Sequence, residues 1–173
     1  SAQYSAYADV ILVSGRHLLS IINDTLDLTK LQEQGGDFDL QDVDPVEAIE
    51  DAMLFVKAHA AEKGMTLDVV DQAGGAMVRA DARGLRQMLI NLMGNAVKYA
   101  RAHGHVSIVA KAAPDSGRIV IDVLDNGPGV KAATLARLGK PFVQDRDSYT
   151  SENSGTGLGL AIVVELAAAH RGS

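Results

Sequence analysis

The 173-residue sequence contains no cysteine, no tryptophan and only three phenylalanines. Without cysteine the chain has neither disulfides nor thiolate metal ligands, which suits a reducing compartment. No apolar run approaches the roughly 20 residues that span a bilayer, so the sequence predicts no membrane segment. A hydrophobic content of 47% is typical of a soluble folded protein.

Basic side chains are also in the minority, because 16 lysines and arginines stand against 22 aspartates and glutamates, for a net charge of −6. Nucleic acid binding depends on clustered cations that neutralise phosphates, and the cations here are scattered, so we expect no nucleic acid partner. No metal-ligand spacing relates the five histidines, and we expect no zinc site; they are His17, His59, His103, His105 and His170.

Residues 5–33 have the apolar periodicity of one long helix. Its apolar positions cover an arc of roughly 200°, about twice the stripe that a helix buries against one neighbour. Such a helix needs partners on two sides, as in a helical hairpin or a dimeric bundle; a helix that lies on its own domain is the alternative. The sequence QGGDF at 34–38 breaks the pattern and predicts a linker.

Beyond the linker, helical and extended patterns alternate. Pro45 suits the first turn of a helix, and the turn PDSG between two apolar runs indicates an antiparallel pair of strands. We expect strands at 38–43, 65–70, 105–113 and 117–125, helices at 45–63 and 80–102, a short helix near 131–138, and a glycine turn leading into a helix over 155–170. Because hairpins interrupt the alternation, the pattern favours an α+β fold in which helices cover a mixed sheet.

The helix at 80–102 carries a polar stripe. On a helical wheel, Asn91, Asn95 and Lys98 fall together at the edge of the apolar face. Asparagine is a mediocre helix former, so two of them one turn apart need a reason. Asparagine oxygens ligate hard cations such as Mg²⁺, and lysine binds phosphate; a solvated flank of the helix is the alternative.

The strand at 117–125 runs into the sequence DNGPG. Because RIVIDVL is mostly apolar, we expect a strand buried on both faces, with Asp125 inside the protein or in a cleft. A carboxylate in such a place accepts hydrogen bonds, for example from the exocyclic amine of a purine. Gly127 and Gly129 let a ligand approach the backbone closely; a plain turn is the alternative.

Three glycines, Gly155, Gly157 and Gly159, stand at alternate positions directly before a helix. The backbone N–H groups and the positive dipole end of such a helix bind anions, so the motif predicts a phosphate cradle. It matches neither the Walker loop nor the dinucleotide-binding pattern. A turn or a helix cap is the alternative.

The order of these motifs resembles the ATP-binding domain of the superfamily of gyrase-type ATPases, heat-shock chaperones and sensor histidine kinases. LRQMLINLMGNAVKYA is similar to the kinase asparagine box, DNGPGV to the first glycine box, KPFVQ to the phenylalanine box and GTGLGL to the second glycine box. SGRHLLSIINDTLDLTKLQ resembles the second helix of the dimerisation and phosphotransfer hairpin of DivJ- and PleC-like kinases. The resemblance implies a hairpin helix and linker over 1–36, and over 37–173 a two-layer α/β sandwich of the Bergerat type.

The resemblance also implies a site for ATP and Mg²⁺. Asn95 would hold the Mg²⁺, Asn91 would line the same catalytic site and Lys98 would reach a phosphate. Asp125 would accept a hydrogen bond from the adenine amine, and the loop 130–154 would be a lid. The further implied contacts are Tyr99, Gly127, Gly129 and Val130 around the purine, Phe142 at one end of the lid, and Gly155, Thr156, Gly157, Leu158 and Gly159 along the triphosphate.

The implied activity is transfer of the γ-phosphoryl group of ATP to a histidine, for relay to an aspartate of a response regulator receiver domain. The implied partners are that receiver domain and a second copy of the chain, joined through the helical hairpin, and the implied location is the cytoplasm. His17 lacks the His-Glu/Asp motif of a phosphoacceptor, so we expect His17 to be structural and the acceptor to lie outside this chain.

Two features depart from the family pattern. Glu152 stands in TSENSGTG, where many of these kinases have a basic lid residue, a role that Arg146 or Lys140 could fill. AAAHRGS stands where the family continues into a closing β-hairpin, so we expect an exposed sheet edge. Three alternatives stay open: a degenerate kinase that serves as a nucleotide- or partner-binding regulatory scaffold, an anti-sigma-type serine kinase, and an ATP hydrolase. The hydrolases use a glutamate about where Asn91 stands, which disfavours the last.

Overall fold

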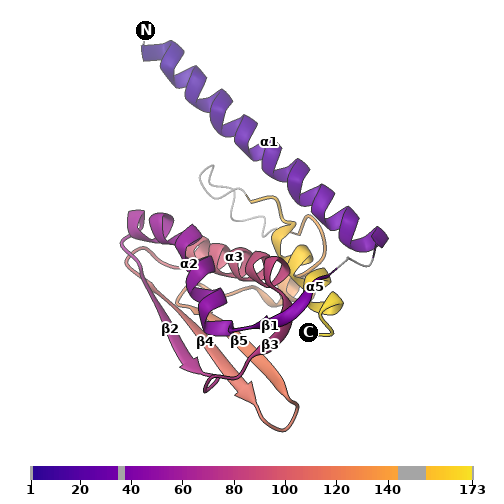
Figure 1. Cartoon of the computed structure of the whole chain (residues 1–173). Coiled ribbons are helices and arrows are strands. Elements are labelled where there is room, and N and C mark those ends of the chain that lie inside the picture. The colour runs from indigo at the N-terminus through magenta and orange to yellow at the C-terminus, as the bar shows by residue number, and fades with distance from the viewer. Residues whose placement is uncertain (1, 35–37, 144–154, 173) are drawn as a thin grey trace.

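The computed structural model describes residues 2–34, 38–143 and 155–172. The helices are α1 (Ala2–Gln34), α2 (Pro45–Glu62), α3 (Ala82–Tyr99), α4 (Ala132–Leu135) and α5 (Gly159–Ala169), and the strands are β1 (Leu40–Val43), β2 (Thr66–Gln72), β3 (Val78–Asp81), β4 (His105–Ala113) and β5 (Arg118–Asp125). Helices α2 and α3 pack together over one face of the strands, α5 lies beside α3, and α1 extends away from this body (Figure 1). The predicted α+β architecture is confirmed.

The described strands form two sheets. β2 pairs in parallel with β4, and β4 pairs antiparallel with β5 across the predicted turn, which gives the expected mixed sheet in the order β2-β4-β5. β1 and β3 form a separate antiparallel pair. Strand β3 was not among the predicted strands, and the helix predicted from residue 80 begins instead at Ala82, after the N-cap residue Asp81.

Strand β5 is one of the two edges of the three-stranded sheet, and the prediction of a strand buried on both faces is wrong. Among the described strands it has one neighbour, β4. Ile119, Ile121 and Val123 pack against the core, whereas Val120 and Leu124 are exposed. Because the side chains at the exposed positions of β5 are also apolar, its sequence does not differ from that of a strand buried on both faces.

The main core lies between the helices α2 and α3 and the sheet. Helix α3 buries side chains at the spacing of one helical face: Leu85, Leu89, Met93, Ala96 and Val97. They meet Ile49 and Val56 of α2, and Val106 and Ile108 of β4. Complete burial of each large aliphatic side chain contributes about 1.5–3 kcal/mol, so this layer holds α3 firmly on the sheet.

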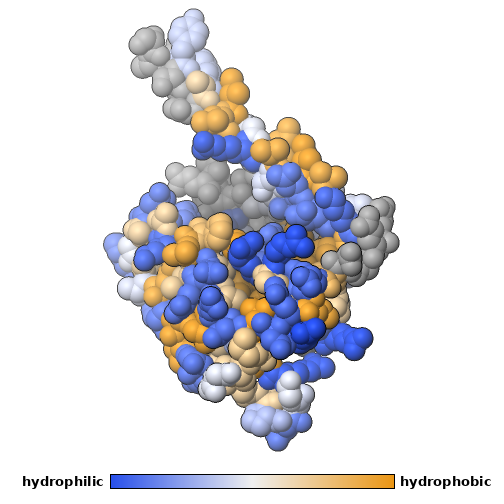
Figure 2. Space-filling view, viewed as in Figure 1, coloured by the Kyte–Doolittle hydropathy of each residue, from blue (hydrophilic) through white to orange (hydrophobic). Residues whose placement is uncertain are grey.

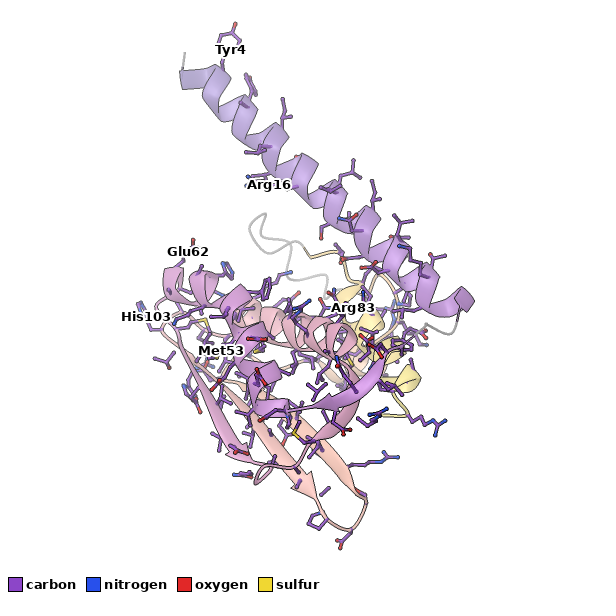
Figure 3. All side chains as sticks on the ribbon, viewed as in Figure 1. Tyr4, Arg16, Met53, Glu62, Arg83 and His103 are labelled. Atoms are coloured by element: carbon purple, nitrogen blue, oxygen red, sulfur yellow. The ribbon has the colours of Figure 1, made fainter. Side chains whose placement is uncertain are left out.

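Lys63, the C-cap residue of α2, ties the ends of two helices together. Its Nζ donates to the carbonyl oxygens of Val97 at 2.7 Å and Lys98 at 2.8 Å, and its own carbonyl accepts from the N–H of His103 at 2.9 Å. The last carbonyls of a helix have no partner within the helix. A positive charge at that end is also attracted to the negative end of the helix dipole. Figure 3 labels Glu62 and His103 at this end of the molecule.

We expect Lys63→Met to lower the free energy of unfolding by about 2 kcal/mol, because two carbonyls at the end of α3 lose a charged donor. Lys57→Met is the control, since Lys57 is exposed on the same helix and should change stability by less than about 0.5 kcal/mol. Urea denaturation measures both variants. Equal losses in the two would contradict the role given to Lys63.

Asp81 joins three parts of the fold, and it is the one buried ionisable side chain among the described residues. Its carboxylate accepts from the N–H groups of Gly84 at 2.8 Å and Asp39 at 3.1 Å. Its own N–H donates to Nε2 of His170 at 3.0 Å, and Nδ1 of His170 lies 2.7 Å from the carbonyl oxygen of Leu166. The ring therefore carries its proton on Nδ1 and connects the end of α5 to the start of α3.

Burial alone would raise the pKa of the Asp81 carboxyl, but the hydrogen bonds from Gly84 and Asp39 and the charge of Arg83 together hold this pKa below its ordinary value. A carboxyl whose pKa is lower in the folded state stabilises the fold above its unfolded pKa, about 3.9. That contribution is lost as the pH falls through the folded-state pKa.

Asp81→Asn should therefore lower the free energy of unfolding at pH 7 by about 2 kcal/mol, and the difference from the wild type should shrink below about pH 4. Denaturant titrations between pH 3 and pH 7 measure this difference. Asp51→Asn, at an exposed position of α2, should show no such pH dependence. If the free energy of unfolding of Asp81→Asn stays below that of the wild type by the same amount down to pH 3, the charge of Asp81 is not the cause of the lost stability.

Helix α1 confirms the predicted long helix, and most of its apolar side chains are uncovered. Near its C-terminal end, Leu28 packs with Leu158, Ile162 and Leu166. The exposed apolar side chains are Tyr4, Tyr7, Val10, Ile11, Leu12, Val13, Leu18, Leu19, Ile22 and Leu26. Figure 2 shows apolar surface along α1, and Figure 3 places Tyr4 near its outer end. Most of the wide apolar arc that the sequence indicates is therefore exposed in this structure.

Some sequence predictions fall outside the described parts of the structure. These are the middle of the linker (35–37), the side chain of His17, and the lid segment 144–154 with Arg146 and Glu152. The short helix expected near 131–138 is present as α4, and Lys140 follows it as an exposed residue. No helix in the described ranges is long and apolar enough to cross a membrane.

Candidate functional site

The polar stripe of α3 faces the glycine segment that precedes α5. Asn91, Asn95 and Lys98 are half-buried on α3. Nδ2 of Asn91 donates to the carbonyl oxygen of Gly159 at 3.3 Å, across 68 positions of sequence. The ammonium of Lys98 lies close to Gly155, since a Cβ at that glycine would be 2.8 Å from Nζ. Two of the predicted motifs therefore form one site.

Asn95 lies one turn after Asn91 on the same side of α3. Within the described part of the chain its side chain forms no hydrogen bond, so its amide oxygen is available as a hard ligand. No cluster of three or more His, Asp or Glu side chains that could hold a metal occurs among the described residues. A Mg²⁺ ion at Asn95 would therefore take its other ligands from phosphates and water, as Mg²⁺ commonly does.

Asp125 ends β5, and it is exposed, so of the two predicted places the protein interior is wrong. Its Oδ1 accepts from the N–H of Gly127 at 2.7 Å, which fixes the direction of the carboxylate. Gly127 is crowded: a Cβ there would be 2.7 Å from Oδ1 of Asp125 and 2.8 Å from the carbonyl oxygen of Tyr99. The first glycine box thus packs directly on the end of α3.

Gly127→Ala should lower the free energy of unfolding by about 1–3 kcal/mol, because the added methyl group forces Asp125 or the end of α3 to move. Gly94→Ala is the matched control, since this α3 glycine has nothing within 4 Å of an added Cβ and alanine favours a helix by about 0.5–1 kcal/mol. Thermal unfolding distinguishes the two. Stabilisation by Gly127→Ala would contradict the close packing.

The second glycine box makes a backbone hydrogen bond to Phe142. The N–H of Phe142 donates to the carbonyl oxygen of Gly157 at 3.0 Å, while the ring of Phe142 is exposed. The side chain of Leu158 is completely buried, so only its backbone could face a ligand, and its N–H donates to Oγ1 of Thr156 at 3.2 Å. Gly157 has a φ of +71°, a conformation that glycine adopts without strain.

The remaining predicted residues lie around the end of α3 and the first glycine box. Nζ of Lys98 sits 4.8 Å from the centre of the Tyr99 ring, a cation–π contact that leaves much of the ring exposed. Gly129 has a φ of +74°, and Val130 after it is exposed. Tyr99, Gly129 and Val130 are thus accessible to a ligand.

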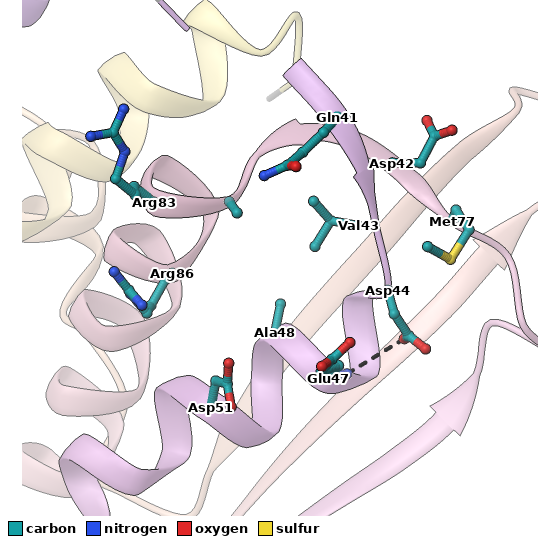
Figure 4. Close-up of a pocket in the computed structure, with 11 residues that line it drawn as sticks. Gln41, Asp42, Val43, Asp44, Glu47, Ala48, Asp51, Met77, Arg83 and Arg86 are labelled. Atoms are coloured by element: carbon teal, nitrogen blue, oxygen red, sulfur yellow. Dashed lines mark hydrogen bonds between the residues drawn. The ribbon is translucent and has the colours of Figure 1, made fainter. Parts of the chain in front are cut away.

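A shallow pocket of about 320 Å³ lies elsewhere, between β1, α2 and the start of α3. Figure 4 shows Arg83 and Arg86 on one side, with Asp44, Glu47 and Asp51 on the other. None of the predicted site residues lines it. Its carboxylates outnumber its guanidinium groups, which disfavours a phosphate ligand.

One contact of the site had no sequence signal. The hydroxyl of Thr156 donates to Oδ2 of Asp24 on α1 at 2.8 Å, although the two residues are 132 positions apart. Asp24 occupies an ordinary polar position of a long helix, so periodicity could not single it out. Only the packing of α1 against α5 brings the two residues together.

Residues 80–173 match the family described as histidine kinase-, DNA gyrase B- and HSP90-like ATPases, and the chain belongs to this family. The histidine protein kinase DivJ of Caulobacter vibrioides is 36% identical over 172 residues, which are 99% of this chain and 28% of DivJ. The non-motile and phage-resistance protein of the same organism is 35% identical, over 98% of this chain and 20% of its own length.

Solved structures agree with this assignment. The full-length protein ShkA, crystallised with AMPPNP, aligns with a TM-score of 0.81 and 36% identity over 98% of this chain and 34% of ShkA. The predicted mixed-sheet fold with covering helices is therefore confirmed. The chain spans less than a third of the length of DivJ and of the phage-resistance protein.

Proposed function

We propose that this chain is the ATP-binding catalytic part of a two-component sensor histidine kinase. It transfers the γ-phosphoryl group of ATP to a histidine outside residues 1–173, for relay to an aspartate of a response regulator receiver domain in the cytoplasm. The observation that carries the proposal is the meeting of the asparagine stripe with the second glycine box, through Asn91 and Gly159 and through Lys98 and Gly155. DivJ is a histidine kinase, and AMPPNP in the ShkA crystal is an ATP analogue.

The phosphate end of the site lies between α3 and α5. Asn95 supplies an amide oxygen to Mg²⁺, and Asn91 holds the glycine segment against α3 and lines the same space. Lys98 brings a positive charge beside Gly155, where it neutralises a phosphate. Helix α5 begins at Gly159 without a side-chain cap, so its first N–H groups and its dipole favour an anion.

The purine end lies at the first glycine box. Gly127 donates to Oδ1 of Asp125 and so leaves Oδ2 to accept from the adenine amine. Tyr99, Gly129 and Val130 line this end, and their exposure leaves room for a flat ring. Phe142 anchors the near end of the lid, through its bond to the second glycine box.

The chemistry requires positioning and charge neutralisation more than a strong protein base. Hydrolysis of ATP by the gyrase-type enzymes needs a glutamate to activate water. Asn91 cannot take up a proton in that way, and its Nδ2 already donates to Gly159. The site therefore favours transfer of the phosphoryl group to a protein histidine over hydrolysis.

Residues 1–36 are proposed to be the second helix and linker of a dimerisation and phosphotransfer hairpin, and 37–173 the catalytic domain. The exposed apolar residues of α1 outside the α5 contact support this division, because a single helix in water does not keep so wide an apolar surface uncovered. In a homodimer, the hairpins of two chains would cover it as a helical bundle.

Asn95→Ala should weaken the binding of Mg²⁺-ATP at least about tenfold, because the metal loses its protein ligand. The affinity for adenosine should stay unchanged, since it has no phosphate. Gln72→Ala, an amide removed from the exposed end of β2, is the control. Isothermal titration calorimetry measures all three proteins, and an unchanged affinity of Asn95→Ala for Mg²⁺-ATP would overturn the assignment of the site.

The same proposal predicts phosphoryl transfer once the chain is joined to a hairpin that carries an acceptor histidine. Incubation with γ-labelled ATP should then label that histidine in the wild type and not in Asn95→Ala. Tight ATP binding without any labelling would instead support the regulatory scaffold.

A further inference from the structure

The side chain of Asp24 lies at the end of the site that is proposed to bind the triphosphate. Asp24 is half-buried on α1, one helical turn before Leu28, so both residues lie on the same face of the helix. Leu28 is 7% exposed in its contact with α5, and Leu158 and Ile162 opposite are completely or nearly buried. Helix α1 lies against α5 at this contact (Figure 1). The contact holds the Asp24 carboxylate 2.8 Å from Oγ1 of Thr156, just before the start of α5.

The link between Asp24 and the glycine segment is the hydroxyl of Thr156. Oγ1 donates its proton to Oδ2 of Asp24 at 2.8 Å and accepts from the N–H of Leu158 at 3.2 Å. Leu158 is the N-cap residue of α5, so this N–H belongs to the group that would otherwise bind an anion. When α1 is docked on α5, the start of α5 therefore faces the Asp24 carboxylate. The N–H of Leu158 is already hydrogen-bonded to Thr156.

We propose that Asp24 sets the affinity of the site for the triphosphate: its carboxylate, held by Thr156 and by the Leu28 contact, opposes the binding of the phosphate tail. The inference rests on the proposed function. Because coupling between two equilibria is reciprocal, binding of ATP in turn favours release of α1 from α5. The helix that carries the dimerisation surface is thereby linked to nucleotide occupancy.

Calorimetry at low ionic strength tests this proposal by measuring the affinities of Asp24→Asn and of the wild type for Mg²⁺-ATP and for adenosine. Asparagine keeps an oxygen that accepts from Thr156 but removes the negative charge. We expect about three- to tenfold tighter binding of Mg²⁺-ATP, a gain that shrinks at high salt, and no change for adenosine. Asp27→Asn is the matched control, because it removes the same charge from an exposed position of the same helix, one turn away.

A second variant tests the docking of the helix itself. Leu28→Ala should loosen the contact of α1 with α5 and should also tighten Mg²⁺-ATP binding. In the Leu28→Ala background, Asp24→Asn should then increase the affinity for Mg²⁺-ATP by a smaller factor than it does in the wild type. Equal or weaker Mg²⁺-ATP binding by Asp24→Asn, with adenosine binding intact, would overturn the inference and leave the nucleotide site standing. Failure of the wild type to bind both ATP and adenosine would overturn the proposed function and this inference with it.

Discussion

Helix α3 makes two kinds of contact at once. Its apolar side chains pack against the sheet, and its polar side chains contact the segment that leads into α5. Leu89, Met93 and Val97 are almost fully buried, and their packing fixes the rotation of the helix about its axis. With that rotation fixed, Asn91 and Lys98 can point only toward the glycine segment. The geometry of the candidate site is therefore a consequence of core packing.

Helix α5 is held at both of its ends, which keeps the glycine segment in place. Asn91 binds the carbonyl of Gly159 at the start of α5, and His170 binds the N–H of Asp81 just after its end. Gly84 leaves room for the imidazole, since a Cβ there would be 3.0 Å from Cε1 of His170. These two links connect the start of α5 to the middle of α3 and the end of α5 to the start of α3, so the glycine segment cannot shift without disturbing α3.

Long periodic segments were predicted well, because burial of one face leaves a regular signal in the sequence. The helices α1, α2, α3 and α5 and the β4–β5 hairpin lie close to their expected ranges. Strand β3 was missed because four residues carry too little periodicity to be separated from the helix that follows them. The prediction that Asp125 lies inside the protein was wrong because an apolar strand does not reveal whether other elements cover one of its faces or both.

The sequence by itself determined the order of the motifs, the polar stripe at helical spacing and the class of fold, since these depend on residues close together along the chain. Only the tertiary structure decided that β5 is an edge, that Lys63 caps α3, and that Asp24 meets Thr156. Such contacts join segments whose separation in sequence carries no information about their distance in space. They arise when the helices find their positions on the sheet, because that packing alone fixes which polar groups come within hydrogen-bonding distance.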